Sequence, residues 1–374
     1  MKKRLLAGLL LLLALGGCLE KPAGWEIFRG NPQRTGYIKV NAPLNPQLDF
    51  AFKSGSPILC SPVVDQQNRV YFSNLAGEFF CLTPQGETVW SYRGESPAYS
   101  AGLDSRHNLA VFGGGDYLWA FTLEGKLKWK FQTDAPVESA PVFTPEGNLL
   151  AGGGEGKFYC LSHEGKLLWS YQMGDSITSS PALSPDGKTV YFGTDDYHIC
   201  ALDLKGSLLW KVKVHAEVTS TPAVAPDGRL FIGSDNGELY ALDSQGRFLW
   251  QLEAGSAISG SPALAPNGNI YLGLSDRGLI AVNPQGKILW KAPTDWDVTA
   301  SPLVDKRGNI YLSLTESRIL AFSPAGKQIL DFKLGEPFYD YPPMFNFSSS
   351  LALDSEGRMY LGSYNGNLYG IGGR

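Results

Sequence analysis

Residue types that usually perform chemistry are few and scattered in this 374-residue chain. The four histidines, His107, His163, His198 and His215, fall in different parts of the sequence repeats described below, so we expect no shared metal site. The chain has no G-x-S-x-G, H-E-x-x-H, P-loop or D-x-D-x-D-G calcium motif. The sequence therefore predicts no catalytic residues, no metal centre and no enzymatic activity.

Four cysteines, Cys60, Cys81, Cys160 and Cys200, form no C-x-x-C motif and no adjacent pair. Cys81 and Cys160 hold equivalent places two repeats apart, too far for a bridge whose Cα atoms must lie within about 7 Å. We expect buried free thiols acting as small apolar side chains, with a Cys60–Cys81 bridge as the alternative.

Cys18 has a different context. Lys2, Lys3 and Arg4 precede an apolar run over residues 5–15, and "LGGC" follows. The run is shorter than the roughly 20 residues that a membrane span needs, and the whole resembles the lipobox of bacterial lipoproteins. We expect a signal peptide over 1–17, lipidation of Cys18 and a linker over 18–24. The alternative is an ordinary signal peptide with a chance cysteine. In bacterial lipoproteins, the residue after the lipidated cysteine decides between retention at the inner and the outer membrane. Under that rule, Leu19 implies retention at the outer membrane.

Charge excludes one class of partner. Three of the 32 basic residues precede Cys18, so the mature chain would carry 29 Lys and Arg against 36 Asp and Glu, a net charge of −7. An acidic chain without a basic stripe is not typical of nucleic-acid binding.

The elements that would position any site follow from one period. Tryptophans recur at spacings of 39, 40, 41, 40 and 40 residues, and Leu330 continues the register: Trp90, Trp129, Trp169, Trp210, Trp250 and Trp290. A functional site needs one set of residues at one place in the fold, whereas a residue that recurs at a fixed spacing marks a repeated structural unit. We expect each indole to pack against the neighbouring unit, near the small residue that opens ten-residue stretches such as "ALDLKGSLLW" (201–210). The alternative is an aromatic ligand-binding ring.

Each unit contains four short β-rich runs separated by turns such as "PDG" and "LKG". Four antiparallel strands per 40 residues predict the blade of a β-propeller. The C-terminal residues 351–371 provide three strands, and "QLDFAFK" provides a fourth in which Phe50 holds the tryptophan register. The sequence predicts an all-β, eight-bladed propeller over residues 25–374, closed by pairing of the N- and C-terminal strands.

The pattern Ala-x-Asp-x-x-Gly-x-x-x-Trp resembles the PQQ-like repeats of quinoprotein dehydrogenases and their non-enzymatic relatives. "WEIFRGNPQRTG" (25–36) is similar to the segment before the first blade in that family. Quinoprotein enzymes are longer and carry an adjacent cysteine pair and calcium ligands. Their absence here leads us to expect no bound PQQ.

Length, lipobox and blade number together resemble the BamB family of propeller lipoproteins. This resemblance implies a lipid-anchored, non-catalytic scaffold, a monomer within a hetero-complex, that binds envelope proteins of the outer-membrane β-barrel assembly machinery. It implies a periplasm-facing position at the outer membrane. The alternative is a protein that binds a PQQ-type quinone, or a related enzyme, using the propeller channel.

Two surfaces are candidates for recognition. The connection before the eighth blade is nine residues longer than the others and carries six large apolar side chains: Phe338, Tyr339, Tyr341, Met344, Phe345 and Phe347. It is interpreted either as a partner-binding loop or as a plug over the ring. Acidic residues also recur in the turns between second and third strands: Asp116, Glu155, Asp195, Asp235, Asp276 and Glu316. They form either a face for a basic partner or ordinary turn chemistry.

Ser-Pro or Thr-Pro opens the first strand of many units, as at Ser61, Ser180 and Thr221. The proline withholds a donor from an exposed strand edge. The hydroxyls are expected either to have no special role or to line a polar channel.

Overall fold

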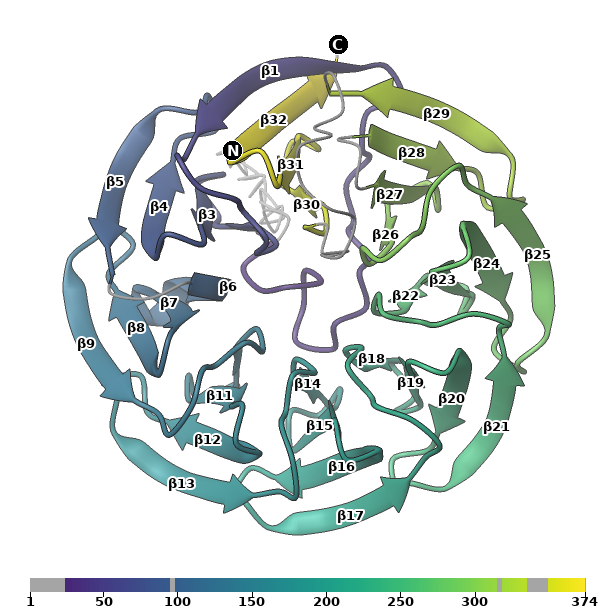
Figure 1. Cartoon of the computed structure of the whole chain (residues 1–374), viewed down its shortest axis with the longest axis horizontal. Helices are drawn as coiled ribbons and strands as arrows, with labels where there is room; N and C mark the ends of the chain where they lie inside the picture. Colours follow the sequence, from purple (N-terminus) through teal and green to yellow (C-terminus); the bar gives the residue numbers. More distant parts are fainter. Residues whose placement is uncertain (1–23, 95–97, 315–317, 335–348, 374) are drawn as a thin grey trace, which may run out of the picture.

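The structure, a computed structural model, describes residues 24–94, 98–314, 318–334 and 349–373. Eight four-stranded antiparallel sheets stand as blades around a ring (Figure 1). One short 3₁₀-helix, η1 (Ser105–His107), is the only helix in those ranges, and none of their segments is a helix long and apolar enough to cross a bilayer. The predicted eight-bladed all-β propeller is confirmed.

The first four blades have these bounds. Blade 1 contains β2 (Val63–Val64), β3 (Val70–Ser73), β4 (Glu78–Leu82) and β5 (Thr88–Arg93). Blade 2 contains β6 (Ala98–Asp104), β7 (Leu109–Gly114), β8 (Tyr117–Phe121) and β9 (Leu127–Gln132). Blade 3 contains β10 (Val142–Phe143), β11 (Leu149–Gly152), β12 (Lys157–Leu161) and β13 (Leu167–Gln172). Blade 4 contains β14 (Ala182–Leu183), β15 (Thr189–Thr194), β16 (His198–Asp203) and β17 (Leu208–Lys213).

The other four complete the ring. Blade 5 contains β18 (Ala223–Val224), β19 (Leu230–Gly233), β20 (Glu238–Leu242) and β21 (Phe248–Glu253). Blade 6 contains β22 (Ala263–Leu264), β23 (Ile270–Leu274), β24 (Gly278–Val282) and β25 (Ile288–Pro293). Blade 7 contains β26 (Leu303–Val304), β27 (Ile310–Leu314), β28 (Arg318–Phe322) and β29 (Gln328–Lys333). Blade 8 contains β30 (Ala352–Leu353), β31 (Met359–Gly362), β32 (Asn367–Gly373) and the N-terminal β1 (Pro46–Lys53).

The ring has two faces, which differ in the turns that they carry. Turns between first and second strands lie with turns between third and fourth strands, as the hydrogen bond from Arg229 Nη1 to Pro284 O shows (3.2 Å). We name this the proximal face. Turns between second and third strands lie with the blade-to-blade connections, since Asp195 N donates to Ser176 O (3.0 Å). We name this the distal face.

The repeated ten-residue stretch is a hairpin with a fixed chemistry. Asp203 closes its turn by accepting the amides of Lys205 (2.9 Å) and Ser207 (2.8 Å). Gly206 has φ +85°, a conformation that costs little only for glycine. Beyond the turn, Ala201 pairs with Trp210, and a bulge leaves Leu209 without a partner in the register. Small residues face the large ring in every complete copy, as expected.

Each tryptophan contacts the next blade. Trp210 Nε1 donates to Ser244 O (3.0 Å), and a Cβ on Gly246 would lie 2.6 Å from the indole. The other five make the equivalent hydrogen bond across the blade boundary. The indoles are only half-buried, however, because they lie on the outermost strand. The predicted packing of each indole against the neighbouring blade is confirmed.

The two ends of the chain share blade 8. β1 pairs with β32 over seven residue pairs, and Phe50 lies opposite Gly370. The Phe50 ring approaches Gly86 of blade 1, as each tryptophan approaches a glycine of the next blade. Phe52 makes edge contacts with Phe72 and Phe80 of blade 1. The predicted closure of the ring by pairing of the N- and C-terminal strands is confirmed. Blade 8 also packs against blade 1 through Phe52.

Second and third strands form the core, and their side chains are almost all buried. The four cysteines in the described part of the chain lie in or beside these strands and are free and buried, so the free-thiol interpretation is confirmed and the Cys60–Cys81 alternative is wrong. Burial raises the pKa of Cys160 and Cys200 to about 12, which keeps both thiols protonated.

Candidate functional surfaces and the filled hub

A hub segment, residues 24–42, crosses the centre of the ring before β1 begins (Figure 1). Its main-chain carbonyls accept the amides of innermost strands from successive blades. Trp25 O binds Val64 N in blade 1 (2.9 Å), and Glu26 O binds Leu103 N in blade 2 (2.7 Å). The carbonyls of Pro32, Gln33, Thr35 and Gly36 bind blades 4, 5, 6 and 7 in the same way. The inner edges of these six blades are therefore paired, not exposed.

Two arginines of the hub segment are completely buried on the ring axis. Arg34 donates to Ala140 O (2.7 Å) and Pro141 O (2.9 Å) of blade 3 and to Pro181 O of blade 4 (2.9 Å). Arg29 donates to Pro262 O (2.7 Å) and Pro302 O in blades 6 and 7. Burial lowers the pKa of each guanidinium to about 9.

Close approach explains one glycine of this segment. A Cβ on Gly36 would lie 2.2 Å from Arg29 Nη2, and the residue has φ +66°. Only glycine allows the segment to fold back over the arginine here. The guanidinium forks reach main-chain carbonyls on opposite sides of the ring, so they hold the hub together.

The Ser-Pro and Thr-Pro hydroxyls do not line a channel. Each accepts the amide of the equivalent position in the preceding blade: Ser180 Oγ binds Ala140 N (2.9 Å) and Ser261 Oγ binds Thr221 N (3.1 Å). The series continues through Ser301, Ser350 and Ser61. The channel interpretation was wrong because neighbouring blades approach closely enough to use these oxygens as inter-blade acceptors.

The filled hub also bears on a quinone cofactor. A planar quinone held in the channel would need the volume and the donors that the hub segment uses. Arg34 directs its N–H groups to carbonyls of Phe28, Ala140, Pro141 and Pro181. Arg29 directs its two Nη groups to Pro262 O and Pro302 O, while its buried Nε has no hydrogen-bond partner in the described chain. These guanidinium groups therefore already bind carbonyls of the protein itself.

A cavity of about 380 Å³ opens on the proximal face, between the hub segment and turns of blades 1–4. Ile27, Leu103 and Phe143 form its apolar floor, with Glu26 and Arg106 at its side. Burial raises the pKa of Glu26 above its ordinary value.

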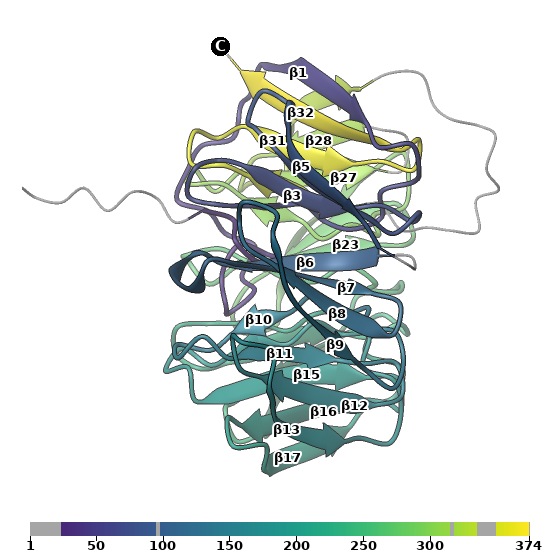
Figure 2. The ribbon, with the colours of Figure 1, turned by 90° about the vertical axis from the view of Figure 1, so that its left-hand side faces the viewer.

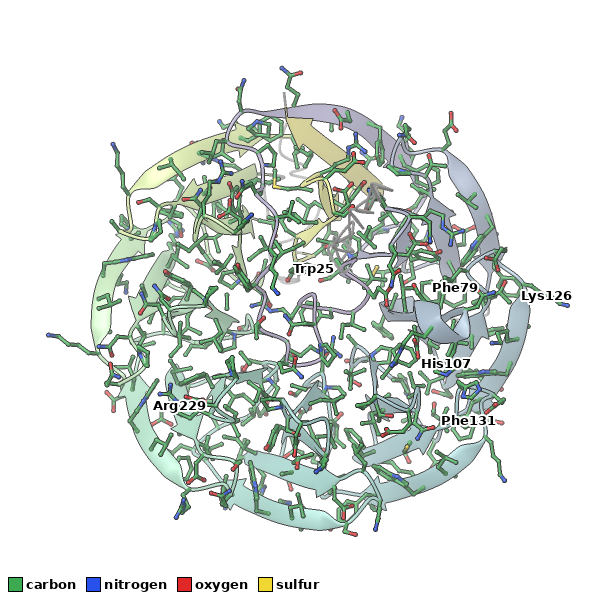
Figure 3. The ribbon with its side chains drawn as sticks, turned by 180° about the vertical axis from the view of Figure 1, so that it is seen from behind. Trp25, Phe79, His107, Lys126, Phe131 and Arg229 are labelled. Atoms are coloured by element: carbon green, nitrogen blue, oxygen red, sulfur yellow. The ribbon has the colours of Figure 1, made fainter. Side chains whose placement is uncertain are left out.

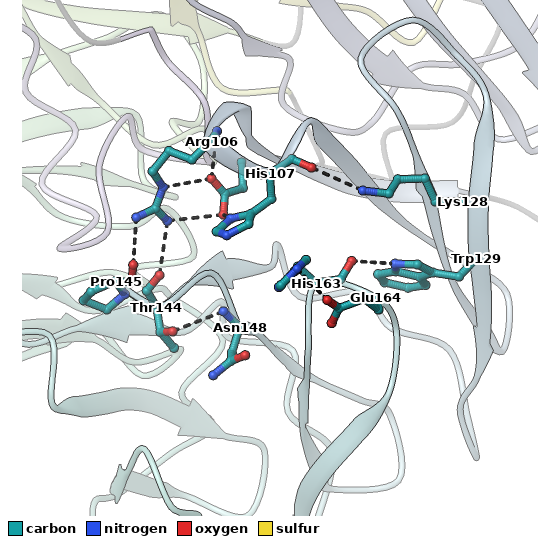
Figure 4. A network of polar contacts seen from close by, with 10 residues as sticks. Arg106, His107, Lys128, Trp129, Thr144, Pro145, Asn148, His163 and Glu164 are labelled. Atoms are coloured by element: carbon teal, nitrogen blue, oxygen red, sulfur yellow. Dashed lines mark hydrogen bonds and ion pairs between the residues drawn. The ribbon is translucent and has the colours of Figure 1, made fainter.

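Two histidines that are far apart in sequence meet at the boundary of blades 2 and 3 (Figure 4). The rings of His107 and His163 stack with centroids 4.4 Å apart. His107 Nδ1 lies 2.7 Å from Asp104 Oδ2, and His163 Nε2 lies 2.6 Å from Glu164 Oε1. The sequence interpretation, which kept the histidines apart, missed this pair. In the described ranges no three His, Cys, Asp or Glu side chains are arranged to hold a metal ion.

The same boundary holds a buried carboxylate. Asp104 accepts from Arg106 Nε (2.9 Å), whose other nitrogens donate to Pro145 O (2.9 Å) and Thr144 O (3.2 Å) of blade 3. Burial alone would raise the pKa of Asp104, but hydrogen bonds from Arg106 and His107 outweigh burial and lower it. This network joins two blades.

Five of the six predicted acidic residues lie in distal turns of the described chain: Asp116, Glu155, Asp195, Asp235 and Asp276. Asp195 and Asp235 each accept a threonine hydroxyl of a blade connection, from Thr178 and Thr219 (both 2.8 Å). Asp276 pairs with Lys291 (3.1 Å). Burial raises the pKa of Asp195, and the neighbouring carboxylates add to that effect. Three of these acidic side chains therefore bind other residues of the protein, in addition to lying on one face.

Several predicted residues lie outside the described ranges. These are Cys18 with its signal segment, Glu316, and the whole candidate loop: Phe338, Tyr339, Tyr341, Met344, Phe345 and Phe347.

Closed blades, a 40-residue period and a filled hub define a β-propeller of the PQQ-like repeat class. A family model described as outer membrane protein assembly factor BamB matches residues 114–218 and 201–372, and the chain belongs to this family. No curated protein sequence matches.

Solved structures share the fold at low sequence identity. BamB from Moraxella catarrhalis is 17% identical with a TM-score of 0.74, covering 87% of this chain and 99% of that one. Quinohemoprotein alcohol dehydrogenase from Comamonas testosteroni is 14% identical with a TM-score of 0.79, covering 94% and 81%. The computationally designed protein Ika8 is 13% identical with a TM-score of 0.73, covering 88% and 100%. Because an enzyme, an assembly factor and a designed protein share it, the fold does not determine function.

Proposed function

We propose that this protein is a non-catalytic, lipid-anchored scaffold that takes part in outer-membrane protein assembly. Membership of the BamB family supports this role. The observation that carries the proposal is the hub, where the chain's own Arg29 and Arg34 occupy the place that a channel ligand would need. Because these two side chains bind the protein's own carbonyls, we infer that the protein acts through its faces and rim.

Cys18 is the proposed lipidation site, which would tether the chain to the outer membrane facing the periplasm. The partner is an envelope protein, with the barrel subunit of the assembly machinery as the first candidate. The proposed contacts are the loop around Phe338–Phe347 and the acidic distal turns, because both lie on or next to blade connections. The protein would act as a monomer within that hetero-complex.

Affinity capture from detergent-solubilised outer membranes tests this role. The mature chain is expected to retain an outer-membrane β-barrel protein. Replacing Phe338, Tyr341 and Phe345 with serine is expected to abolish that retention. The control replaces exposed Leu48, Val89 and Leu127 with serine and should retain it.

Two results would contradict the proposal. One is capture of no barrel protein by the wild-type chain. The other is tight PQQ binding in a spectral titration with Ca²⁺, which would favour a quinone-dependent role. Unchanged capture by the loop variant would remove the loop, but not the acidic turns, from the interface.

A further inference from the structure

Exposed apolar side chains of this protein concentrate at two repeat positions. Of the fourteen large hydrophobic residues exposed in the described chain, eleven lie one or two places before the tryptophan register of an outermost strand. Leu209 is 51% exposed and Leu249 is 47% exposed. Scattered apolar residues need no explanation, but a pattern that recurs from blade to blade does.

Four consecutive blades carry the complete pattern. In blades 3–6 both positions are apolar and exposed, at residues 167–168, 208–209, 248–249 and 288–289. A basic side chain precedes each pair in the turn, and all four are exposed: Lys166, Lys205, Arg247 and Lys287. Arg247 also pairs with Asp243 of its own turn, yet its side chain is 76% exposed. We name these twelve residues the basic–apolar rim.

The local fold explains why the apolar pairs stay outside. The bulge in each outermost strand leaves one residue, such as Leu209, without a register partner. The next residue, Trp210, then turns inward to the neighbouring blade. Most of the surface of these pairs therefore stays outside the blade, although the Phe248 ring also contacts Tyr240 of its own blade.

The rim lies on the side of the ring where the chain enters. Outermost strands begin at the third-to-fourth turns, which lie on the proximal face. Lys126, in one of these turns, lies at the outer edge of the ring (Figure 3). Gly24 lies beside the main chain of Val64 and Asp65, at the start of the first-to-second turn of blade 1, since a Cβ on Gly24 would lie 2.7 Å from Val64 O. Residues 18–23 can extend at most about 20 Å from that point. A lipid on Cys18 would keep a bilayer close to this face.

Charge favours a lipid surface over other partners. The outermost strands of blades 3–6 carry three lysines against one glutamate, and the four turn cations of the rim add to this excess, although the whole chain has a net charge of −4. Basic side chains next to exposed leucines are the composition of interfacial membrane-binding surfaces, where lysines contact anionic headgroups. Figure 2, an edge view, shows that the ring is a thick disc whose wall is formed by the outermost strands.

We propose that the basic–apolar rim of blades 3–6 docks on an anionic lipid bilayer. The docked protein holds its proximal face toward the membrane and presents the acidic distal turns away from it. The inference rests on the proposed membrane anchorage for its biological setting, but a variant without the anchor tests it separately.

Vesicle flotation of the mature chain carrying Cys18→Ser tests the rim without the lipid. Binding is expected to vesicles of phosphatidylethanolamine with phosphatidylglycerol, and not to pure phosphatidylcholine. Replacing Leu168, Leu209, Leu249 and Leu289 with serine is expected to lower the partition coefficient by at least about tenfold. The matched control replaces Leu48, Val89 and Leu127, which hold the same repeat positions outside blades 3–6.

Three results would overturn the proposal. These are no binding of the Cys18→Ser chain to anionic vesicles, equal loss in rim variant and control, and concentration-dependent dimerisation that the rim substitutions abolish. The last result would mean that a second copy covers the rim. Loss of lipidation at Cys18 in cells would contradict the proposed anchor while leaving the vesicle result intact.

Discussion

A single indole joins each blade to its neighbour, and Trp210 offers the simplest test. Trp210→Ala removes the hydrogen bond to Ser244 O and the ring that covers Gly246. Because the indole is half-buried, the expected loss is about 2–3 kcal/mol of unfolding free energy, less than for a fully buried tryptophan. Urea denaturation followed by circular dichroism measures it.

The adjacent Leu209 is the control for that measurement. Its side chain is 51% exposed and it has no register partner at the bulge, so Leu209→Ala should change the free energy of unfolding by less than about 0.5 kcal/mol. Equal effects of the two substitutions would show that the indole does not join the blades.

Asp104 makes a pH-dependent contribution. Its pKa is lowered in the folded chain, so its stabilisation is complete above the ordinary carboxyl pKa and disappears as pH falls through the folded value. Asp104→Asn is expected to cost about 2 kcal/mol at pH 7, and the difference from wild type should shrink below about pH 4. Chemical denaturation between pH 7 and pH 3 measures this difference.

An exposed ion pair provides the comparison. Asp134 binds Lys157 at 2.7 Å, but its side chain is 54% exposed. Asp134→Asn should therefore cost less than about 1 kcal/mol. A pH-independent loss for Asp104→Asn would indicate that shape, not charge, matters at the blade boundary.

At the scale of elements, the hub segment (residues 24–42) contains no helix or strand. Its main-chain carbonyls instead accept hydrogen bonds from amides of successive blades. Arg34→Lys keeps the charge but cannot reach carbonyls of blades 3 and 4 with one ammonium group. Buried carbonyls would lose their donors, and we expect a loss of about 2–4 kcal/mol. Hydrogen exchange should become faster at Val224 and Leu264, whose amides bind this segment.

Gln33→Ala is the matched control. The Gln33 side chain makes one long contact to Ser184 O (3.3 Å), while its main-chain carbonyl keeps the bond to blade 5. If Arg34→Lys and Gln33→Ala were equally stable, the guanidinium fork would not hold the hub.

The blades could be predicted from the sequence, whereas the hub could not. A 40-residue period with turn glycines specifies hairpins, because Gly206 and its equivalents need positive φ and the strands alternate around them. Residues 24–42 have no period, and Arg29 and Arg34 bind main-chain carbonyls, which leave no side-chain signature. The stacked His107 and His163 were missed because adjacency of turns in neighbouring blades depends on the closed ring.

At the scale of the whole molecule, the two faces and the wall differ in chemistry. The distal face gathers acidic turns, and the wall carries basic residues with exposed leucines. The proximal face receives the chain at Gly24. A closed ring fixes the positions of these surfaces relative to one another. Each blade is packed between two neighbours and cannot rotate without breaking contacts at a blade boundary. Closure in blade 8 is therefore what the proposed docking geometry depends on.

Closure itself can be weakened by Phe50→Ala with Phe52→Ala, which removes the rings that β1 packs on blades 8 and 1. β1 should then separate from β32, and exchange in residues 367–373 should accelerate by about tenfold or more. Exchange in β16 (His198–Asp203) should change less, since this strand belongs to the sheet of blade 4. Exposed Leu48→Ala is the control. Uniform acceleration in both peptides would contradict local closure and indicate that the ring opens only by global unfolding.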